Sequence, residues 1–147
     1  MREVYVLVNP NYNQTITLYN CLSAHDNDDS VDKWQRTVLE NCFYKSETTE
    51  VQSGTQATKA NTYTVRIPCT ENTKYKSYNE WKNLSNEERT NYFTLSDNDI
   101  VVKGVCVDEI EGSSVVILQK NKPDAFKITS VSDNTSHRMG KHYRVGG

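Results

Sequence analysis

The sequence predicts a mainly β protein, a small β-barrel or sandwich with one short helical insert, and three observations lead to this prediction. Short runs of β-branched and aromatic residues recur along the chain, and turns rich in Asn, Asp and Gly separate them. Tyr, Thr, Asn and Ser are abundant, which favours strands and polar loops over long helices. The 147 residues suit one domain, residues 1–147, and with 35% hydrophobic residues its core is modest.

Composition and charge also narrow the function classes. The net charge is −2 and Lys and Arg form no cluster, so the basic stripe typical of a nucleic-acid-binding surface is missing. No apolar run is long enough for a membrane span and the first residues lack the pattern of a signal peptide, so we expect no membrane partner. Four widely spaced cysteines are expected to stay free thiols in a reducing cytosol. They are Cys21, Cys42, Cys69 and Cys106.

Two strands are expected near the N-terminal end of the sequence. Residues 4–8 form a short β-favouring run, which the turn signal that begins at Asn9 brings to an end. In residues 15–19 apolar and polar side chains alternate strictly, which places Ile16 and Leu18 on one face. We expect the two strands to pair as a hairpin.

Residues 34–44 are expected to form a longer strand. Thr, Val, Cys, Phe and Tyr are poor helix formers, so a strand is favoured over the alternative of an amphipathic helix. Because side chains alternate along a strand, Trp34 and Cys42 are predicted on one face, with Leu39 and Phe43 on the other.

Residues 45–60 are low in complexity, and their one large apolar side chain is Val51. Such a stretch cannot offset its ordering entropy by burial, and loops of this length are usually functional or disordered. We therefore expect a long polar loop at 45–60 that serves assembly or a channel rather than the fold. Its candidate residues are Glu47, Glu50, Val51, Gln52, Gln56 and Lys59.

Alternation returns in residues 61–67, where Tyr63, Val65 and Ile67 are expected on the core face of a strand. Pro68 follows directly. Because proline cannot donate to a strand ladder, it ends this strand or places it at a sheet edge.

A short helical insert is expected within residues 77–92. Ser77 and Ser85 are each followed three residues later by Glu, the capping-box pattern that marks the start of a helix. Trp81 and Leu84 supply a short apolar stripe. One or two helical turns are predicted at each serine, and helix is expected nowhere else.

The stretch from residue 93 to residue 110 organises the rest of the chain. A turn of Ser, Asp and Asn leads into the run that begins at Ile100. Gly104 then marks a tight bend or bulge before a second β-favouring run. Further turns separate three more such runs. With those above, the strands are expected near residues 4–8, 15–19, 34–44, 61–67, 99–107, 115–118, 125–131 and 142–145.

The sequence contains no convincing catalytic or metal-binding constellation. The acidic run of residues 26–32 resembles a calcium loop, but Val31 and Thr37 stand where such a loop needs Gly and Glu. The His and Cys residues lack the close spacing of structural zinc sites, and neither a nucleophile elbow nor a phosphate loop occurs. We therefore expect no enzyme activity, no cofactor and no metal.

Three stretches of the chain carry a resemblance to a known class of proteins: residues 34–44, residues 93–110, and the tail from residue 125 onward. Their motif residues are Phe93, Asp99, Gly104, Ile110, His142, Tyr143 and Arg144. In a short chain rich in Asn and Lys, they resemble the head-closure, or stopper, proteins in the neck of tailed phages of Gram-positive bacteria. The resemblance covers most of the chain after Trp34 and implies a small β-barrel rather than a catalytic site.

This resemblance implies a structural virion protein that assembles in the host cytoplasm and forms a homo-oligomeric ring at the head–tail interface. Its partners would be the portal or adaptor protein and the tail-terminator or tail-tube protein, with packaged DNA only passing nearby in the channel. A tail-terminator or minor tail protein is the alternative within the virion. The alternative from another class is a β-sandwich that binds a carbohydrate or another ligand on its aromatic side chains.

Overall fold

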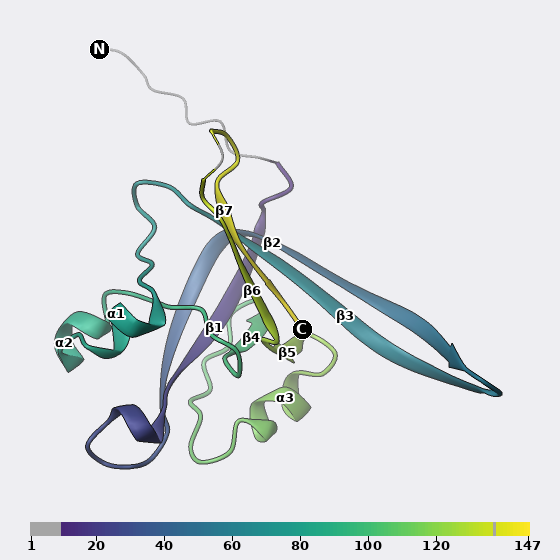
Figure 1. Cartoon of the computed structure of the whole chain (residues 1–147), viewed down its shortest axis with the longest axis horizontal. Coiled ribbons are helices and arrows are strands. Elements are labelled where there is room, and N and C mark those ends of the chain that lie inside the picture. Colours follow the sequence, from purple (N-terminus) through teal and green to yellow (C-terminus); the bar gives the residue numbers. More distant parts are fainter. Residues whose placement is uncertain (1–9, 137) are drawn as a thin grey trace.

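A computed structural model describes residues 10–136 and 138–147 of the chain (Figure 1). In this part of the chain the strands are β1 (Gln14–Leu22), β2 (Lys33–Ser53), β3 (Gln56–Pro68), β4 (Ile100–Lys103), β5 (Ala125–Lys127), β6 (Ser130–Asn134) and β7 (His142–Gly146). The helices are the 3-10 turn η1 (Ala24–Asp26), α1 (Tyr78–Lys82), α2 (Asn86–Arg89) and α3 (Val115–Asn121). Strands therefore dominate, and every helix described is short.

The strands form one antiparallel sheet in the order β5-β4-β1-β2-β3-β7-β6, which curls into a half-barrel. β5 and β6 follow each other in the chain but lie at opposite ends of this order. Between them the Ile128 N–H donates to the Asp99 carbonyl and the Thr129 N–H donates to the Gly146 carbonyl, both at 2.8 Å. Residues 125–134 therefore draw the two ends of the curled sheet toward each other. The predicted fold class, mainly β, is confirmed.

The larger hydrophobic core lies on the inner face of the half-barrel. Tyr63 of β3 stacks on Phe126 of β5, with ring centroids 4.8 Å apart, although these strands are not neighbours in the sheet. This face is therefore the concave one. Alternate residues of the strands point into it, as strand geometry requires. Among them are Ile16, Leu18, Tyr63, Val65, Ile67, Val101 and Val145, which confirms the core positions predicted in residues 15–19 and 61–67.

A second, smaller core lies on the outer face of the same strands. Tyr19, Ile100 and Val102 point outward and pack against Ile117 of α3. The segment after β4 covers them, because the Tyr19 hydroxyl donates to the carbonyl oxygen of Asp108 at 2.6 Å. Both faces of β1 and β4 are thus covered, and this is why β4 begins with three consecutive apolar residues, all of them buried.

A buried polar junction ties β1 to the turn before β4. The Asn20 amide donates to the Asp99 carboxylate (2.8 Å) and to the Thr94 carbonyl (2.6 Å), and it accepts from the Thr94 N–H. The Asp99 carboxylate also accepts the N–H groups of Cys21 and Ser96, each at 3.0 Å. Asn20 and Asp99 are 0% and 1% exposed, so these bonds replace hydration that both side chains have lost.

A β-bulge in β2 overturns part of the predicted arrangement of residues 34–44. The strand itself is present, and Trp34 and Leu39 pack on opposite faces as expected. Cys42, however, lies in the same core as Leu39, and Phe43 faces away. The reason is a shift of register between β1 and β2 near Asn41, whose φ is +57°. One extra residue reverses every face that follows it.

The prediction of an unstructured loop at residues 45–60 is wrong. β2 and β3 stay paired through this stretch, from Phe43 opposite Arg66 to Ser53 opposite Gln56. Thr and Val suit an extended backbone, and Gly54, with φ +65°, supplies the turn. Low hydrophobicity excluded burial but did not exclude a solvated hairpin.

The strand predicted at residues 115–118 is wrong as well, because this segment is helix α3, and helix is therefore not confined to residues 77–92. Val115 and Val116 are exposed, and Ile117 is the buried residue of the helix. The segment lies beside the sheet rather than in it, so no neighbouring strand can satisfy its backbone. A helix satisfies most of that backbone internally.

Two other predicted strands are shortened or divided. β4 ends at Lys103, because Gly104, with φ +81°, turns the chain. The Cys106 N–H then donates to the side-chain hydroxyl of Thr17 instead of to the backbone of a neighbouring strand. The strand predicted at residues 125–131 is split into β5 and β6.

The hairpin expected between residues 4–8 and residues 15–19 is wrong, because β1 pairs with β2 on one side and with β4 on the other. The expectations for the helix caps and for the ends of β3 and β7 are confirmed. Ser77 and Ser85 cap α1 and α2 as predicted, and β7 contains residues 142–145. Pro68 is the last residue of β3. The strand expected at residues 4–8 lies outside the described residues.

Candidate functional site

The described residues hold no cluster of three or more His, Cys, Asp or Glu side chains placed to bind a metal ion. All four cysteines are free, with Cys42 and Cys106 buried. Burial raises the pKa of the Cys42 thiol to about 12, which suits a packed thiol rather than a nucleophile. No helix in the described part of the chain is long and apolar enough to cross a membrane.

The far end of the β2–β3 hairpin projects away from the rest of the molecule (Figure 1). β1 stops pairing with β2 at Cys42, and β7 stops pairing with β3 at Thr64. Tyr63 still bonds to Gly147, and from Glu47 opposite Thr62 the two strands pair with each other alone, without a register shift, down to Ser53 opposite Gln56. We call residues 47–62 the arm.

The arm is polar and solvent-exposed. Glu50 of β2 lies directly opposite Lys59 of β3, and the Thr48 hydroxyl donates to the Asn61 side-chain oxygen at 2.9 Å. The residues predicted for assembly are gathered here, with Glu47, Glu50, Gln52, Gln56 and Lys59 exposed and Val51 in β2 opposite Thr58. The structure therefore places all six residues on one projecting element, which is a hairpin and not a loop.

The outer edges of the arm carry backbone groups that point away from the hairpin. Tyr63 exchanges both of its backbone hydrogen bonds with Gly147, on the side of β3 remote from β2. Backbone direction alternates along a strand, so the N–H groups of Lys59 and Asn61 also point outward. The cross-strand register assigns the same outward direction to Thr48 and Glu50 on β2. No strand of the described part of the chain pairs with either edge of the arm.

The root of the arm is firmly held in the main core. The Tyr44 ring contacts both Tyr63 and Phe126, with centroids 6.4 and 6.3 Å apart. On the other face the Arg66 guanidinium lies over the Phe43 ring, 5.1 Å from its centroid. Burial raises the pKa of the Tyr44 hydroxyl. These aromatic contacts fix the direction in which the arm leaves the sheet.

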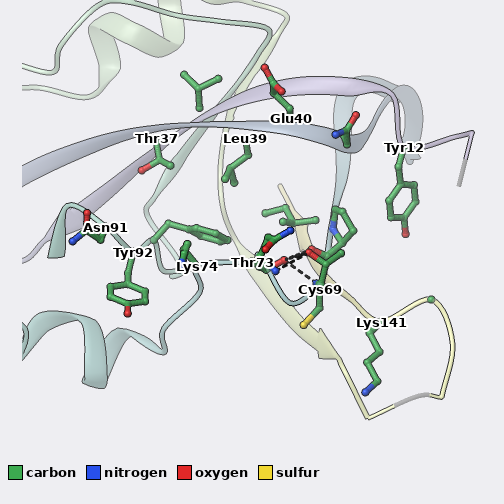
Figure 2. Close-up of a pocket in the computed structure, with 18 of the residues that line it drawn as sticks. Tyr12, Thr37, Leu39, Glu40, Cys69, Thr73, Lys74, Asn91, Tyr92 and Lys141 are labelled. Carbon is green, nitrogen blue, oxygen red and sulfur yellow. Dashed lines mark hydrogen bonds between the residues drawn. The ribbon is translucent and has the colours of Figure 1, made fainter. Parts of the chain in front are cut away.

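A groove of about 690 Å³ lies at the opposite end of β2 and β3 (Figure 2). Figure 2 shows its lining side chains converging from several segments far apart in the sequence. Leu39 and Phe93 form part of the apolar wall of the groove, and Lys74 and Lys141 are the cationic residues that line it. The Thr73 hydroxyl donates to the Pro68 carbonyl at 3.0 Å and braces the loop that follows β3.

The sequence analysis did not find this groove. Its residues lie on β2, on the loop after β3, in residues 90–93 and in the segment just before β7, and no local motif links these segments. The available signal was indirect: Pro68 ends β3, so the chain must leave the sheet beside the strand end. The presence of a hollow there depends on tertiary structure.

The motif residues of the resemblance are not brought together at one surface. Phe93 and Tyr143 are core residues, and Asp99 belongs to the buried junction. Gly104 forms the bend after β4, and Ile110 packs on the outer core. His142 and Arg144 stand beside Tyr143 on β7. The buried residues among them, Phe93, Asp99 and Tyr143, therefore belong to the packing of the fold, whereas Arg144 is exposed.

Neither a curated protein nor a solved structure was found to match the chain. One family model matches residues 11–147, which include all of the strands described above and most of the sequence. The chain therefore belongs to the family of unknown function DUF6751.

Proposed function

We propose that this chain is a structural subunit of the neck of a tailed phage, where copies form a ring between the portal or adaptor and the tail. In this role the half-barrel is the body of the subunit, and the arm reaches a neighbouring protein or the channel. The ring would close the head, retain DNA and dock the tail.

The arm is the observation that carries this proposal. A polar ribbon with no core of its own contributes little to the stability of the body, since a lone two-stranded hairpin is marginal in water. An element that stabilises its own fold so little, yet has regular strand pairing, is best explained by a contact with another protein. The resemblance of residues 34–44, residues 93–110 and the tail to head-closure proteins adds support.

A second candidate function rests on the groove. Its volume is within the range of small-ligand sites, and Tyr12, Tyr92 and Lys74 offer stacking and charge to a sugar or a similar ligand. Chemical-shift titration with oligosaccharides tests it. Saturable shifts confined to the groove would favour this ligand-binding class over the neck.

A nonsense mutation of the gene in its own phage tests the proposed function. We expect DNA-filled or leaking heads beside separate, complete tails, because head closure and tail docking both fail. Adding the purified wild-type protein to such a lysate is expected to restore joined particles. Normal yields of tailed, infectious particles from the mutant would refute the neck role.

A further inference from the structure

We propose that the arm is a self-association surface, in which the β2 edge of one copy pairs with the β3 edge of the arm of the next copy. This inference rests on the ring assembly of the proposed function, but on no part of its phage context. The occupant of each arm edge is thus a second copy of this chain.

The unprotected backbone of the arm is the first reason. Thr48 and Glu50 on β2, and Lys59 and Asn61 on β3, direct their N–H groups outward, as the bonds of Tyr63 to Gly147 establish. Strand edges in monomeric proteins are usually blocked by proline, a bulge, a covering segment or charged side chains, and of these the arm has only charges, Glu47 and Glu50 on β2 and Lys59 on β3. In residues 47–62 there is no proline, and the strand register is unbroken. The arm thus offers two open strand edges for β-augmentation.

The distribution of charge selects which edges meet. β2 contributes Glu47 and Glu50 to the arm, whereas β3 contributes Lys59. Pairing the β2 edges of two copies would set Glu near Glu, and pairing the β3 edges would set Lys near Lys, and both are unfavourable across strands. Pairing β2 with the β3 of a neighbour places opposite charges together. Complementarity therefore favours the mixed arrangement.

The symmetry of the assembly follows from this choice. A contact between two different edges is heterologous, so each copy still has one edge free after pairing. Arms that point the same way pair antiparallel, because β2 runs toward the tip and β3 runs away from it. The arrangement then continues from copy to copy and closes into a ring when the rotation per copy permits.

Two proline variants of the isolated full chain separate the edges. Glu50→Pro blocks the β2 edge and Lys59→Pro blocks the β3 edge, and each removes an outward N–H that the hairpin itself does not use. Glu50→Gln and Lys59→Gln are the matched controls, because they remove the charge and keep the amide. Cross-strand nuclear Overhauser contacts between Thr48 and Asn61 verify that the hairpin is intact.

Sedimentation velocity over a range of concentrations gives the outcome. We expect the wild type to oligomerise. Each proline variant alone is expected to associate more weakly than the wild type by a factor of about ten at least, because its one open edge lacks a partner. A mixture of the two variants is expected to form a one-to-one dimer, since the open β2 edge of one meets the open β3 edge of the other. Each glutamine control is expected to oligomerise.

Three results of these sedimentation experiments would overturn the proposal. The first is a monomeric wild type, the second is association as strong as that of the wild type in both proline variants, and the third is dimerisation of one proline variant by itself.

Hydrogen exchange gives a readout that needs no variant. Exchange of the amides of Thr48, Glu50, Lys59 and Asn61 is expected to slow as the wild-type concentration rises, and unchanged exchange would overturn the proposal. The neck role is tested separately in particles, so arm pairing and phage function can fail independently.

Discussion

At the scale of single residues, Asp99 is the group whose environment departs most from water. Burial raises its pKa from the ordinary value of 3.8 to about 7, although three N–H donors aimed at the carboxylate oppose this shift. The position joins β1 to the turn before β4. The ionisation of one carboxyl group is thus linked to the closure of the sheet.

The titration of Asp99 gives the first prediction. Its folded-state pKa lies above the unfolded value, so its contribution to stability is complete below about pH 4 and is lost as the pH rises through 7. The loss amounts to at most about 4 kcal/mol. We expect the Asp99 carboxyl carbon signal in NMR to titrate with a midpoint near pH 7. A midpoint below pH 4 would show that the three donors dominate over burial.

Asn20 provides the second prediction. Asn20→Ala removes one of the three donors to the Asp99 carboxylate and the partner of both backbone groups of Thr94, and leaves these groups buried. We expect the free energy of unfolding to fall by about 3 kcal/mol in urea titrations. Exposed Asn72→Ala is the matched control, with an expected change below about 0.5 kcal/mol. Equal effects in the two variants would contradict a structural role for the junction.

At the scale of elements, helix α3 shows how context overrides local preference. Its Val-Val-Ile sequence favours a strand, and the turn-rich flanks are those of a strand too. The prediction failed because the segment lies over the outer core, where only one of its faces finds apolar partners. In a segment of only seven residues, hydrophobic periodicity cannot distinguish a short helix with one buried face from a strand in a sheet.

A matched pair of substitutions tests this account of α3. Ile117→Ala is expected to lower the free energy of unfolding by about 3 kcal/mol, because Ile117 is 4% exposed in the outer core. Val115→Ala, at a side chain that is 50% exposed, is expected to change it by less than about 0.5 kcal/mol. A strand with Ile117 buried would bury Val115 on the same face, so a large loss in Val115→Ala would contradict the helix.

The arm permits a prediction about its own removal. Replacing Glu47 to Lys59 with a short Gly/Ser link discards exposed side chains and keeps Tyr44 and Tyr63 at the root. We expect the melting temperature of the domain to change by less than about 3 °C, since little apolar surface is lost. Under the proposed neck role, the same truncation in a phage is expected to impair head–tail joining or DNA retention. A truncated chain that fails to fold would show that the arm is part of the core architecture.

How far the sequence could predict these elements depended on burial. The alternation of apolar and polar side chains correctly located the buried parts of β1 and β3, in residues 15–19 and 61–67. The two serine caps located α1 and α2. Both are local signals with a direct physical cause. The bulge near Asn41 and the groove depend on contacts between distant segments. The arm has no alternation of apolar and polar side chains, and Val51 is its one large apolar residue, so its composition predicts a loop.

At the scale of the whole molecule, stability is distributed unevenly. β1 is paired on both sides and packs on both faces, whereas the strands of the arm pair only with each other and the described side chains of residues 47–62 are exposed. In dilute solution we expect the amides of Leu18 and Tyr19 to exchange only on global unfolding. Glu47 and Thr62, paired within the arm, are expected to exchange orders of magnitude faster through local opening. Equal protection in native-state hydrogen exchange would contradict this gradient.

The bulge at Asn41 has a mechanical consequence for the arm. From Glu47 to the turn the arm extends about 25 Å, so a rotation of about 10° at its root displaces the tip by about 4 Å. Bulges and aromatic packing at the root thus act on the tip through a long lever. Substitutions at Asn41 or Tyr44, far from any partner, would aim the tip at a different point in space. In the proposed assembly, residues away from the arm edges can therefore set how neighbouring copies are oriented.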